Sequence, residues 1–275
     1  MNIKKTIIRS QSVRYVYTFI KHVLLFDMIG WAKRLTIKLN SNSTKIYKLK
    51  DSAERNRCFI VCTGPSLKVE DVEKLSEEST FGVNGIFLMY DKTSWKPNYY
   101  ICTDAPHFQD FSEGYSLNLN ELSKDGLFLN EDSMNYVKSL EKSRRNDQNT
   151  MYLRFSQWNR AWHFTYPRFN PDLISGIYAF GTVTNIAITV AVYMGFKEIY
   201  IIGADCSNMN KHFVNDKSDE SKSESFLNET MIAMREGYET MSRIYGKYNV
   251  KIYNAIRGGE LEFFPRRNLD DVLKR

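Results

Sequence analysis

Polar side chains follow several short apolar segments of this 275-residue sequence, and these side chains could bind a ligand or move a proton. They belong to Thr63, Ser66, Asn84, Thr103, Asp104 and Asp205, and Gly64 and Pro65 form a turn with Thr63 and Ser66. The apolar segments are typical of buried parallel strands, whose carboxyl ends lie together at the edge where open α/β sheets bind ligands. We therefore expect these residues to form one site, although a turn or a helix cap is a simpler role for Asp104 and for Asp205.

A second group of candidates lies at the start of a long uncharged segment. Residues 181–194 favour a buried helix, which Gly195 would end, and residues 199–202 favour a strand. The N-terminus of this helix, where free N–H groups and two hydroxyls suit an anion, would consist of Gly181, Thr182, Val183 and Thr184. The Gly-Pro-Ser turn at residues 64–66 could bind phosphate in a similar way, although it also fits an ordinary turn between a strand and a helix.

Two side chains could act as a general base. His212 lies in a polar loop over residues 206–223 and has an ordinary pKa near neutrality, whereas Asp104 has the better-defined position at a strand end. A solvated loop histidine and a strand-end cap are the alternative roles. The four histidines lack metal-ligand spacing and the four cysteines form no CxxC pair, so we expect reduced thiols in a cytosolic protein, with no metal and no cofactor.

Charge is distributed unevenly along the chain. The net charge is +6, but residues 1–50 contain eight Lys, three Arg and one Asp and so carry +10, which leaves −4 for residues 51–275. The basic character therefore belongs to the N-terminal segment and not to the rest of the chain. We expect no nucleic-acid partner for that larger part.

The basic segment predicts a helix over residues 13–39. Its apolar residues recur at three- and four-residue steps and are Val13, Tyr17, Ile20, Leu24, Met28, Trp31 and Leu35. Charged residues interrupt this stretch, so it should not span a membrane, and it lacks the pattern of a signal peptide. Two roles stay open. The helix lies on an anionic membrane surface, which would place the protein in the cytoplasm at the inner face of the cell membrane, or it docks on the domain or on a second subunit of a homo-oligomer.

Residues 40–44 are polar and are predicted to be a linker. We divide the chain into a basic amphipathic helical extension with this linker, residues 1–50, and a larger domain, residues 51–275. Strands are predicted at residues 57–62, 81–84, 97–104, 126–129, 151–154, 199–202 and 250–253. Because helices and short turns alternate with them, they indicate an α/β fold with a doubly wound, mostly parallel, Rossmann-like sheet.

An aromatic and arginine-rich stretch, residues 155–172, is predicted to form a loop or lid over the site. In and beside it, Arg154, Arg160 and Arg168 are candidate partners of phosphate or carboxylate.

The strand-end motifs occur in a fixed order that resembles two known groups of proteins. They are CTGPSL (62–67), GVNG (82–85), YYICTD (99–104), the segment 181–205 and KIYNAIRGGELEFFPR (251–266). Together they resemble the MptE-like Rossmann family, which includes motility-accessory-type glycosyltransferases, and they are similar to the family 42 bacterial sialyltransferases. The resemblance covers residues 57–267 and does not extend to residues 1–50.

The sialyltransferase resemblance implies a CMP-activated nonulosonic acid as donor, with no metal. It implies that the nucleotide contacts Gly64, Pro65, Ser66, Asn84, Thr182, Val183 and Thr184, and that His212 is the base. This sequence has Thr63 where the related turn has Asn, and Thr103 and Asp104 where an Asn follows the third strand.

Three functions are therefore compared. The first is a glycosyltransferase that moves a sugar, such as sialic acid, from a nucleotide-sugar donor to a surface glycan or lipid-linked glycan acceptor. The second is the activity that names the MptE-like family, a hydroxymethylpterin pyrophosphokinase, which would need Mg²⁺ near Asp104 and Asp205. The third is a non-catalytic nucleotide-binding scaffold.

Overall fold

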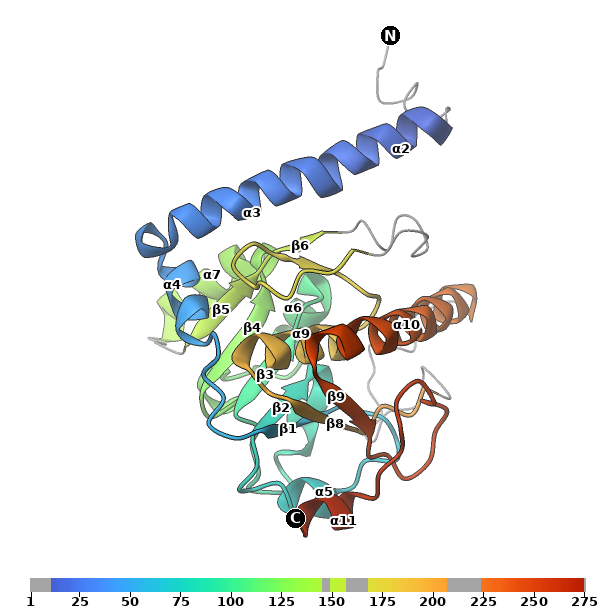
Figure 1. Ribbon diagram of the computed structural model, residues 1–275. Helices are drawn as coiled ribbons and strands as arrows, with labels where there is room; N and C mark the ends of the chain where they lie inside the picture. Colours follow the sequence, from blue (N-terminus) through green and yellow to red (C-terminus); the bar gives the residue numbers. More distant parts are fainter. Residues whose placement is uncertain (1–10, 145–148, 157–167, 207–223, 275) are drawn as a thin grey trace.

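A seven-stranded parallel sheet forms the centre of the protein, whose computed structural model describes residues 11–144, 149–156, 168–206 and 224–274 (Figure 1). The strands are β1 Arg57–Val61, β2 Thr80–Val83, β3 Tyr99–Cys102, β4 Gly126–Asn130, β5 Thr150–Leu153, β8 Glu198–Ile202 and β9 Lys251–Asn254. Their order is β5-β4-β3-β2-β1-β8-β9, and every neighbouring pair is parallel. The predicted Rossmann-like sheet is confirmed, with strand ends that differ from the prediction by a few residues at most.

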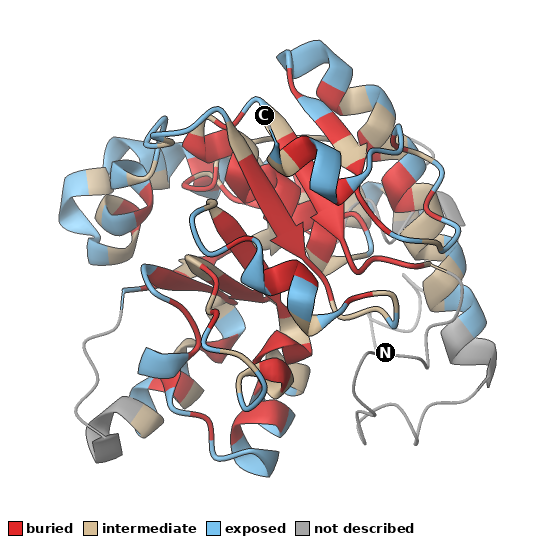
Figure 2. Cartoon of the chain, turned by 90° about the horizontal axis from the view of Figure 1, so that it is seen from below, coloured by how far each residue is buried: buried red, intermediate tan, exposed pale blue. Residues whose placement is uncertain are grey.

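Helices cover both faces of this sheet. The longer ones are α6 Ala105–Gly114, α7 Met134–Arg144, α9 Val183–Met194 and α10 Glu224–Tyr245, and the single-turn ones are α5 Val69–Glu73 and α11 Leu269–Leu273. Short 3-10 helices, η3 Asn84–Met89, η4 Leu119–Glu121, η5 Glu131–Ser133 and η7 Gly246–Tyr248, lie in the connections. Figure 2 shows the buried strands enclosed between these helices.

Alternate residues of β1 pack into two separate cores. Cys58, Ile60 and Cys62 lie in the core with α9 and α10, whereas Phe59 and Val61 lie in the core with α5, α6, α7 and α11. The prediction that Cys58 and Cys62 share one face is therefore confirmed. All four cysteines are free.

Helix α9 ends at Gly195 as the sequence predicts, and it begins two residues later than the predicted start at residue 181. Thr182 caps its N-terminus, and Gly195 ends it in the left-handed conformation, with φ of 102°. Ala187 and Ala191 are fully buried, so the helix backbone lies close to the sheet. The packing of α9 against β1, β2 and β3 therefore fixes the positions of the backbone groups at both ends of the helix.

The N-terminal segment forms one long, slightly irregular helix that lies across the outside of the domain (Figure 1). It consists of α2 Gln11–Phe19, a π-helical turn η1 Ile20–Leu24 and α3 Leu25–Leu35, and it is followed by η2 Ile37–Leu39 and α4 Ser41–Lys48. Among the described helices, none is both long and apolar enough to cross a membrane.

The expected linker at residues 40–44 is wrong. The side chain of Asn40 caps α4 by accepting a hydrogen bond from the Ser43 N–H at 2.9 Å. The Asn42 side chain bonds both backbone groups of Tyr152 in the edge strand β5, donating to its carbonyl at 2.8 Å and accepting from its N–H at 2.7 Å. These polar residues therefore cap a helix and cover a sheet edge.

The long helix is fixed to a small two-stranded sheet, β6 Phe155–Ser156 and β7 Ile177–Tyr178. Ser156 Oγ donates to the carbonyl of His22 at 2.7 Å, and the Tyr178 hydroxyl donates to Asp27 at 2.6 Å. A Cβ at Gly30 would lie 2.6 Å from the carbonyl oxygen of Ser175, so glycine is needed for this close approach. The docked position, one of the two roles left open by the sequence, is what the structure shows.

Two arginines that we expected to meet phosphate or carboxylate of a ligand hold this helix instead. Arg154 is buried, and its Nη2 donates to the carbonyls of Phe26 at 2.7 Å and Ser175 at 2.5 Å. Arg168 pairs with Asp27 at 2.8 Å. Arg160 and most of the predicted lid lie outside the described residues.

Candidate active site at the carboxyl edge of the sheet

The order of the strands reverses between β1 and β8. From β1 the chain builds one half of the sheet outward to β5, and from β8 it builds the other half outward to β9. In open α/β sheets a ligand binds outside the carboxyl ends of the strands at such a switch point. The loops that follow β1 and β8 contain the predicted residues 63–66 and Asp205, so these residues lie at the position expected for a ligand.

These two loops are interlocked through their backbones. The Gly64 N–H donates to the carbonyl of Gly203 at 2.6 Å, and the Ser66 N–H donates to Asp205 Oδ2 at 2.9 Å. A Cβ at Gly64 would lie 2.2 Å from Asp205 Oδ2, and a Cβ at Gly203, which has φ of +67°, would lie 2.5 Å from the carbonyl oxygen of Cys62. Both glycines are required because the loops touch at backbone distance.

The loop after β9 meets the same residue. The Glu260 N–H donates to the carbonyl of Asp205 at 2.6 Å, and Gly259, with φ of +70°, leaves no room for a Cβ against Asp205. Asp205 is 6% exposed. It therefore joins three loops, and its carboxylate occupies the Ser66 N–H that we expected to bind phosphate. The alternative role of a turn residue describes Asp205 better than that of a direct ligand.

The N-terminus of α9 provides the other predicted anion position. Thr182 Oγ1 accepts a hydrogen bond from the Thr184 N–H at 3.3 Å, while Gly181 is exposed and Val183 is half-buried. The Thr184 side chain is buried, with its Oγ1 3.3 Å from Cys62 Sγ. Thr184 thus packs into the core, and the Thr182 N–H donates to the carbonyl of Phe180 at 2.9 Å. The predicted anion position is therefore reduced to the N–H groups of Gly181 and Val183.

Tyr238, a buried tyrosine of α10, lies against this end of α9. Burial raises its pKa well above the ordinary value, the thiols of Cys206 and Cys62 raise it further, and hydrogen bonding to the hydroxyls of Thr184 and Thr182 opposes this shift. In the sequence, Tyr238 is one of several apolar residues that recur at three- and four-residue steps along α10. A tyrosine in such a stripe gives no sign that its hydroxyl reaches the end of another helix.

The ends of β2 and β3 bring further polar groups to the same edge. Asn84, half-buried, has φ of +47°, a conformation that asparagine tolerates better than most residues. The Thr103 carbonyl accepts from Asn130 Nδ2 at 3.1 Å. Asp104 is exposed and caps α6 by accepting from the His107 N–H at 3.2 Å, which is the alternative role that the sequence left open. His212 lies outside the described residues.

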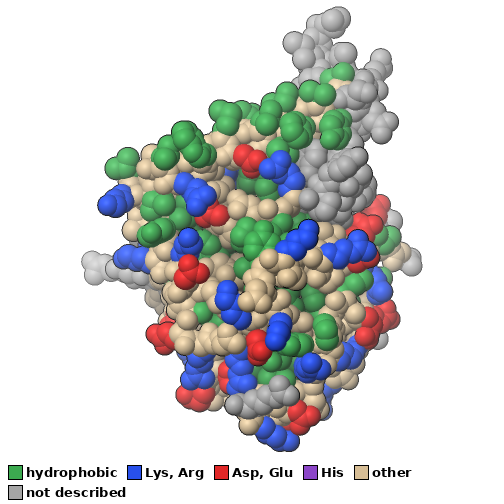
Figure 3. All heavy atoms as spheres, in the orientation of Figure 1, with side chains coloured by type: hydrophobic (Ala, Val, Ile, Leu, Met, Phe, Trp, Pro, Cys, Tyr) green, Lys and Arg blue, Asp and Glu red, His purple; other side chains and the backbone are tan. Residues whose placement is uncertain are grey.

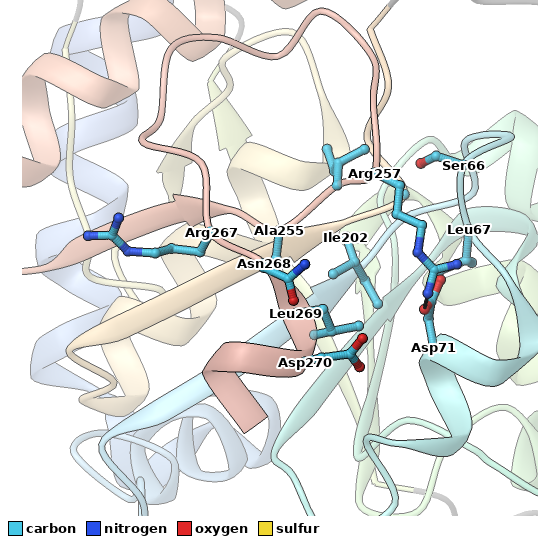
Figure 4. A pocket seen from close by; sticks show the side chains of 12 residues that line it. Ser66, Leu67, Asp71, Ile202, Ala255, Arg257, Arg267, Asn268, Leu269 and Asp270 are labelled. Carbon is cyan, nitrogen blue, oxygen red and sulfur yellow. Dashed lines mark hydrogen bonds and ion pairs between the residues drawn. The ribbon is translucent and has the colours of Figure 1, made fainter. Parts of the chain in front are cut away.

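A small cavity of about 80 Å³ lies beside the β1 loop, and the sequence did not indicate it. Figure 4 shows Arg257, from the segment after β9, reaching toward the buried Asp71 of α5, with which it forms an ion pair. Ser66, Asn268 and Asp270 also line the cavity. Its volume suits a few water molecules and is well below the roughly 300 Å³ of a site for a larger ligand. Within the described part of the chain, no three His, Cys, Asp or Glu side chains are grouped as metal ligands.

The geometry defines an open parallel α/β protein with a candidate ligand site at its topological switch point. Residues 33–211 match the family model described as "6-hydroxymethylpterin diphosphokinase MptE-like", and the chain belongs to this MptE-like family. The family resemblance expected from the strand-end motifs is thereby confirmed. No curated protein matches this sequence.

Solved structures of similar fold include two kinds of transferase. The Maf glycosyltransferase from Magnetospirillum magneticum AMB-1 has a TM-score of 0.49 and 16% identity over 82% of this chain, which spans only 37% of that protein. The Campylobacter jejuni sialyltransferase CstII in complex with CMP-3FNeuAc has a TM-score of 0.47 and 15% identity, over 78% of this chain and 88% of that one. The structure of the same sialyltransferase with cytidine-5′-monophosphate has a TM-score of 0.42 and 16% identity, over 77% of this chain and 84% of that one.

Proposed function

We propose that this protein is a glycosyltransferase that takes a sugar from a nucleotide-activated donor, with a CMP-linked nonulosonic acid as the donor class. One observation carries the proposal. The capped N-terminus of α9 and the left-handed Asn84 lie at the carboxyl edge, beside a switch point whose loops are locked together by Asp205. The N–H groups of Gly181 and Val183 suit the donor phosphate, and the side chain of Asn84 suits a base or a sugar hydroxyl.

The proposed reaction breaks the bond between the sugar and the phosphate and forms one from the sugar to an acceptor hydroxyl. The phosphate leaves with the bonding electrons, so donors at the start of α9 would stabilise the charge that develops on it. The acceptor loses its proton to a general base, for which His212 and Asp104 remain the candidates. Neither a metal nor a cofactor is part of this proposal.

The nucleotide class is tested first, by thermal shift of the full chain with CMP, UDP, GDP and ATP. We expect CMP to raise the melting temperature most, and Asn84→Ala to reduce that shift. As the control, Tyr115→Ala changes an exposed residue at the end of α6 and should leave the shift unchanged. A preference for ATP over CMP contradicts the proposed donor.

The identity of the general base is tested by measuring the rate of sugar transfer from a CMP-linked donor to acceptor glycans. His212→Ala should lower the transfer rate by roughly 10²–10⁴-fold and leave nucleotide affinity nearly unchanged. If Asp104→Asn abolishes transfer while His212→Ala keeps about half of it, Asp104 is the base and the role of His212 is refuted.

The description of the matching family favours a second candidate, a diphosphokinase acting on 6-hydroxymethylpterin. This reaction would use ATP and Mg²⁺, so EDTA should abolish it, whereas the proposed sugar transfer should survive EDTA. Formation of a pterin diphosphate from ATP establishes the second candidate and removes the first. Nucleotide binding without turnover of either substrate set points to the scaffold function.

A further inference from the structure

The apolar residues that the sequence analysis identified along the long N-terminal helix are exposed to solvent. Of the fifteen large hydrophobic side chains that are exposed in the described part of the chain, eleven belong to residues 13–39. They are Val13, Val16, Tyr17, Ile20, Leu24, Leu25, Met28, Ile29, Trp31, Leu35 and Leu39. Figure 3 shows hydrophobic side chains along the outer ridge of this helix. We call this surface the outer face of α2–α3.

The opposite face of the same helix packs on the domain. Val23 and Phe26 are buried, and Tyr15 and Phe19 pack against the same core. The buried Arg154 places its guanidinium 3.8 Å from the centre of the Phe26 ring. Because these contacts fix the rotation of the helix, the outer face is held outward and is not covered by the described parts of the protein.

Charge around this surface indicates the occupant. Residues 11–50 contain eight Lys or Arg and one acidic residue, Asp27. Asp27 is bound by both Arg168 and Tyr178, at 2.8 and 2.6 Å. Lys33 and Arg34 pair with Glu131 and Asp172 of the domain at 3.1 and 3.3 Å, whereas Lys21 in η1 and Lys38 in η2 are exposed. The ridge is thus apolar with basic flanks, and its single acid is tied to the domain.

We infer that the outer face of α2–α3 binds an anionic lipid surface, with the helix lying in the plane of the interface. Aliphatic side chains and Trp31, which is 66% exposed, would enter the boundary between headgroups and acyl chains. The lysines would contact lipid phosphates. A second copy of this chain suits the face less well, because a symmetric pair would bring the two basic segments together.

The bound helix would also hold the candidate site in a fixed orientation. Tyr178, which bonds Asp27, lies in β7, and β7 is only three residues before Gly181 at the start of α9. The membrane contact does not rest on the proposed chemistry, and it is tested without donor or acceptor.

Flotation of the full-length protein with lipid vesicles is the test. The protein should float with vesicles containing phosphatidylglycerol, bind phosphatidylcholine vesicles far less, and lose binding at high salt. Ile29→Glu places a charge on the outer face and should weaken binding by about tenfold or more. Ile232→Glu is the matched control, because Ile232 is similarly exposed but lies on α10, and it should bind like the unchanged protein.

Three results overturn the inference. The first is failure to float with anionic vesicles, and the second is equal loss of binding for both isoleucine variants. The third is a dimer, seen by light scattering without lipid and abolished by Ile29→Glu, in a protein that does not bind vesicles. That last result assigns the outer face to a second copy of the chain. Circular dichroism of each variant shows whether the fold is kept, and exposed positions make this the expected result.

Discussion

The carboxylate of Asp205 accepts a hydrogen bond from the backbone N–H of Ser66 at 2.9 Å, across 139 residues of sequence. This single contact joins the loops of the two central strands at the point where the sheet changes direction. It gives Asp205 a positioning role at the candidate site.

Asp205→Ala should lower the free energy of unfolding by about 1–3 kcal/mol, because it leaves a half-buried N–H without its acceptor. Asp205→Asn keeps an acceptor oxygen at the same place and should lose less. Urea unfolding of the two variants measures the difference. If Asp205→Ala is as stable as the unchanged protein, the hydrogen bond does not hold the loops.

Substitutions of Asn84 should separate its backbone role from its side-chain role. Asn84→Gly accepts the left-handed conformation and should keep the stability of the unchanged protein, whereas Asn84→Ala should lose about 1 kcal/mol. Both should weaken nucleotide binding by about fivefold, the effect of one lost hydrogen bond. Titration calorimetry and urea unfolding give the two values. Nucleotide affinity that is unchanged in both variants removes Asn84 from the site.

Arg154→Ala should release the N-terminal helix from the domain. It removes two hydrogen bonds and a cation–π contact in a buried position, so we expect a loss of at least about 2 kcal/mol. Arg168→Ala is the matched control, since its ion pair with Asp27 is largely exposed and should contribute under about 1 kcal/mol. Urea unfolding and limited proteolysis of residues 11–40 check the prediction, and equal effects of the two variants contradict it.

The buried thiols should make the protein less stable at alkaline pH. Burial raises the pKa of Cys62 and of Cys102 to about 12, and it raises the pKa of Cys206 to about 12 as well. Their ordinary value is 9.0. The stabilisation is complete below the pKa of the unfolded chain and is lost as the pH rises from about 9 toward 12, because only the unfolded thiols ionise there.

Alkylation with iodoacetamide at pH 8 checks the thiol prediction independently. A rise in pKa from 9 to 12 lowers the thiolate fraction about a thousandfold, so native cysteines should react far more slowly than those of the urea-unfolded chain. The urea-unfolded chain is the control for reagent activity. Rapid alkylation of the native protein shows that a thiol is accessible and overturns the assignment.

The sheet was predictable because parallel strands buried on both faces are continuous apolar runs, as in residues 199–202. The C-terminal end of α9 was predictable for a similar reason, because Gly195 lacks a side chain and tolerates the left-handed conformation that ends a helix. Such features depend on neighbours in the sequence. They do not require knowledge of which distant segment lies opposite.

The site was less predictable because its contacts join residues that are far apart in the sequence. Nothing near Asp205 in the sequence shows that its carboxylate will accept a hydrogen bond from the Ser66 N–H. Likewise, nothing near Thr184 shows that its hydroxyl will lie against the thiol of Cys62. The long helix has apolar residues on both faces, so its period identified the outer face but could not show that Phe26 and Gly30 pack inward. Polar residues such as Asn42 resemble a linker until the sheet edge that they cover is known.

The pairing of β1 with β8 has a consequence for the order of events on the ribosome. The partners of β1 in β8 lie about 140 positions later in the chain, since Arg57 pairs with Glu198 and Val61 with Ile202. At roughly 5–20 residues per second, that partner is synthesised about 7–28 seconds afterwards. During this interval β1 can pair with β2 on one side only. A nascent chain therefore passes through a half-sheet whose open edge is the future centre of the protein, and a chaperone that covers this edge would bind the same strand that later carries the candidate site.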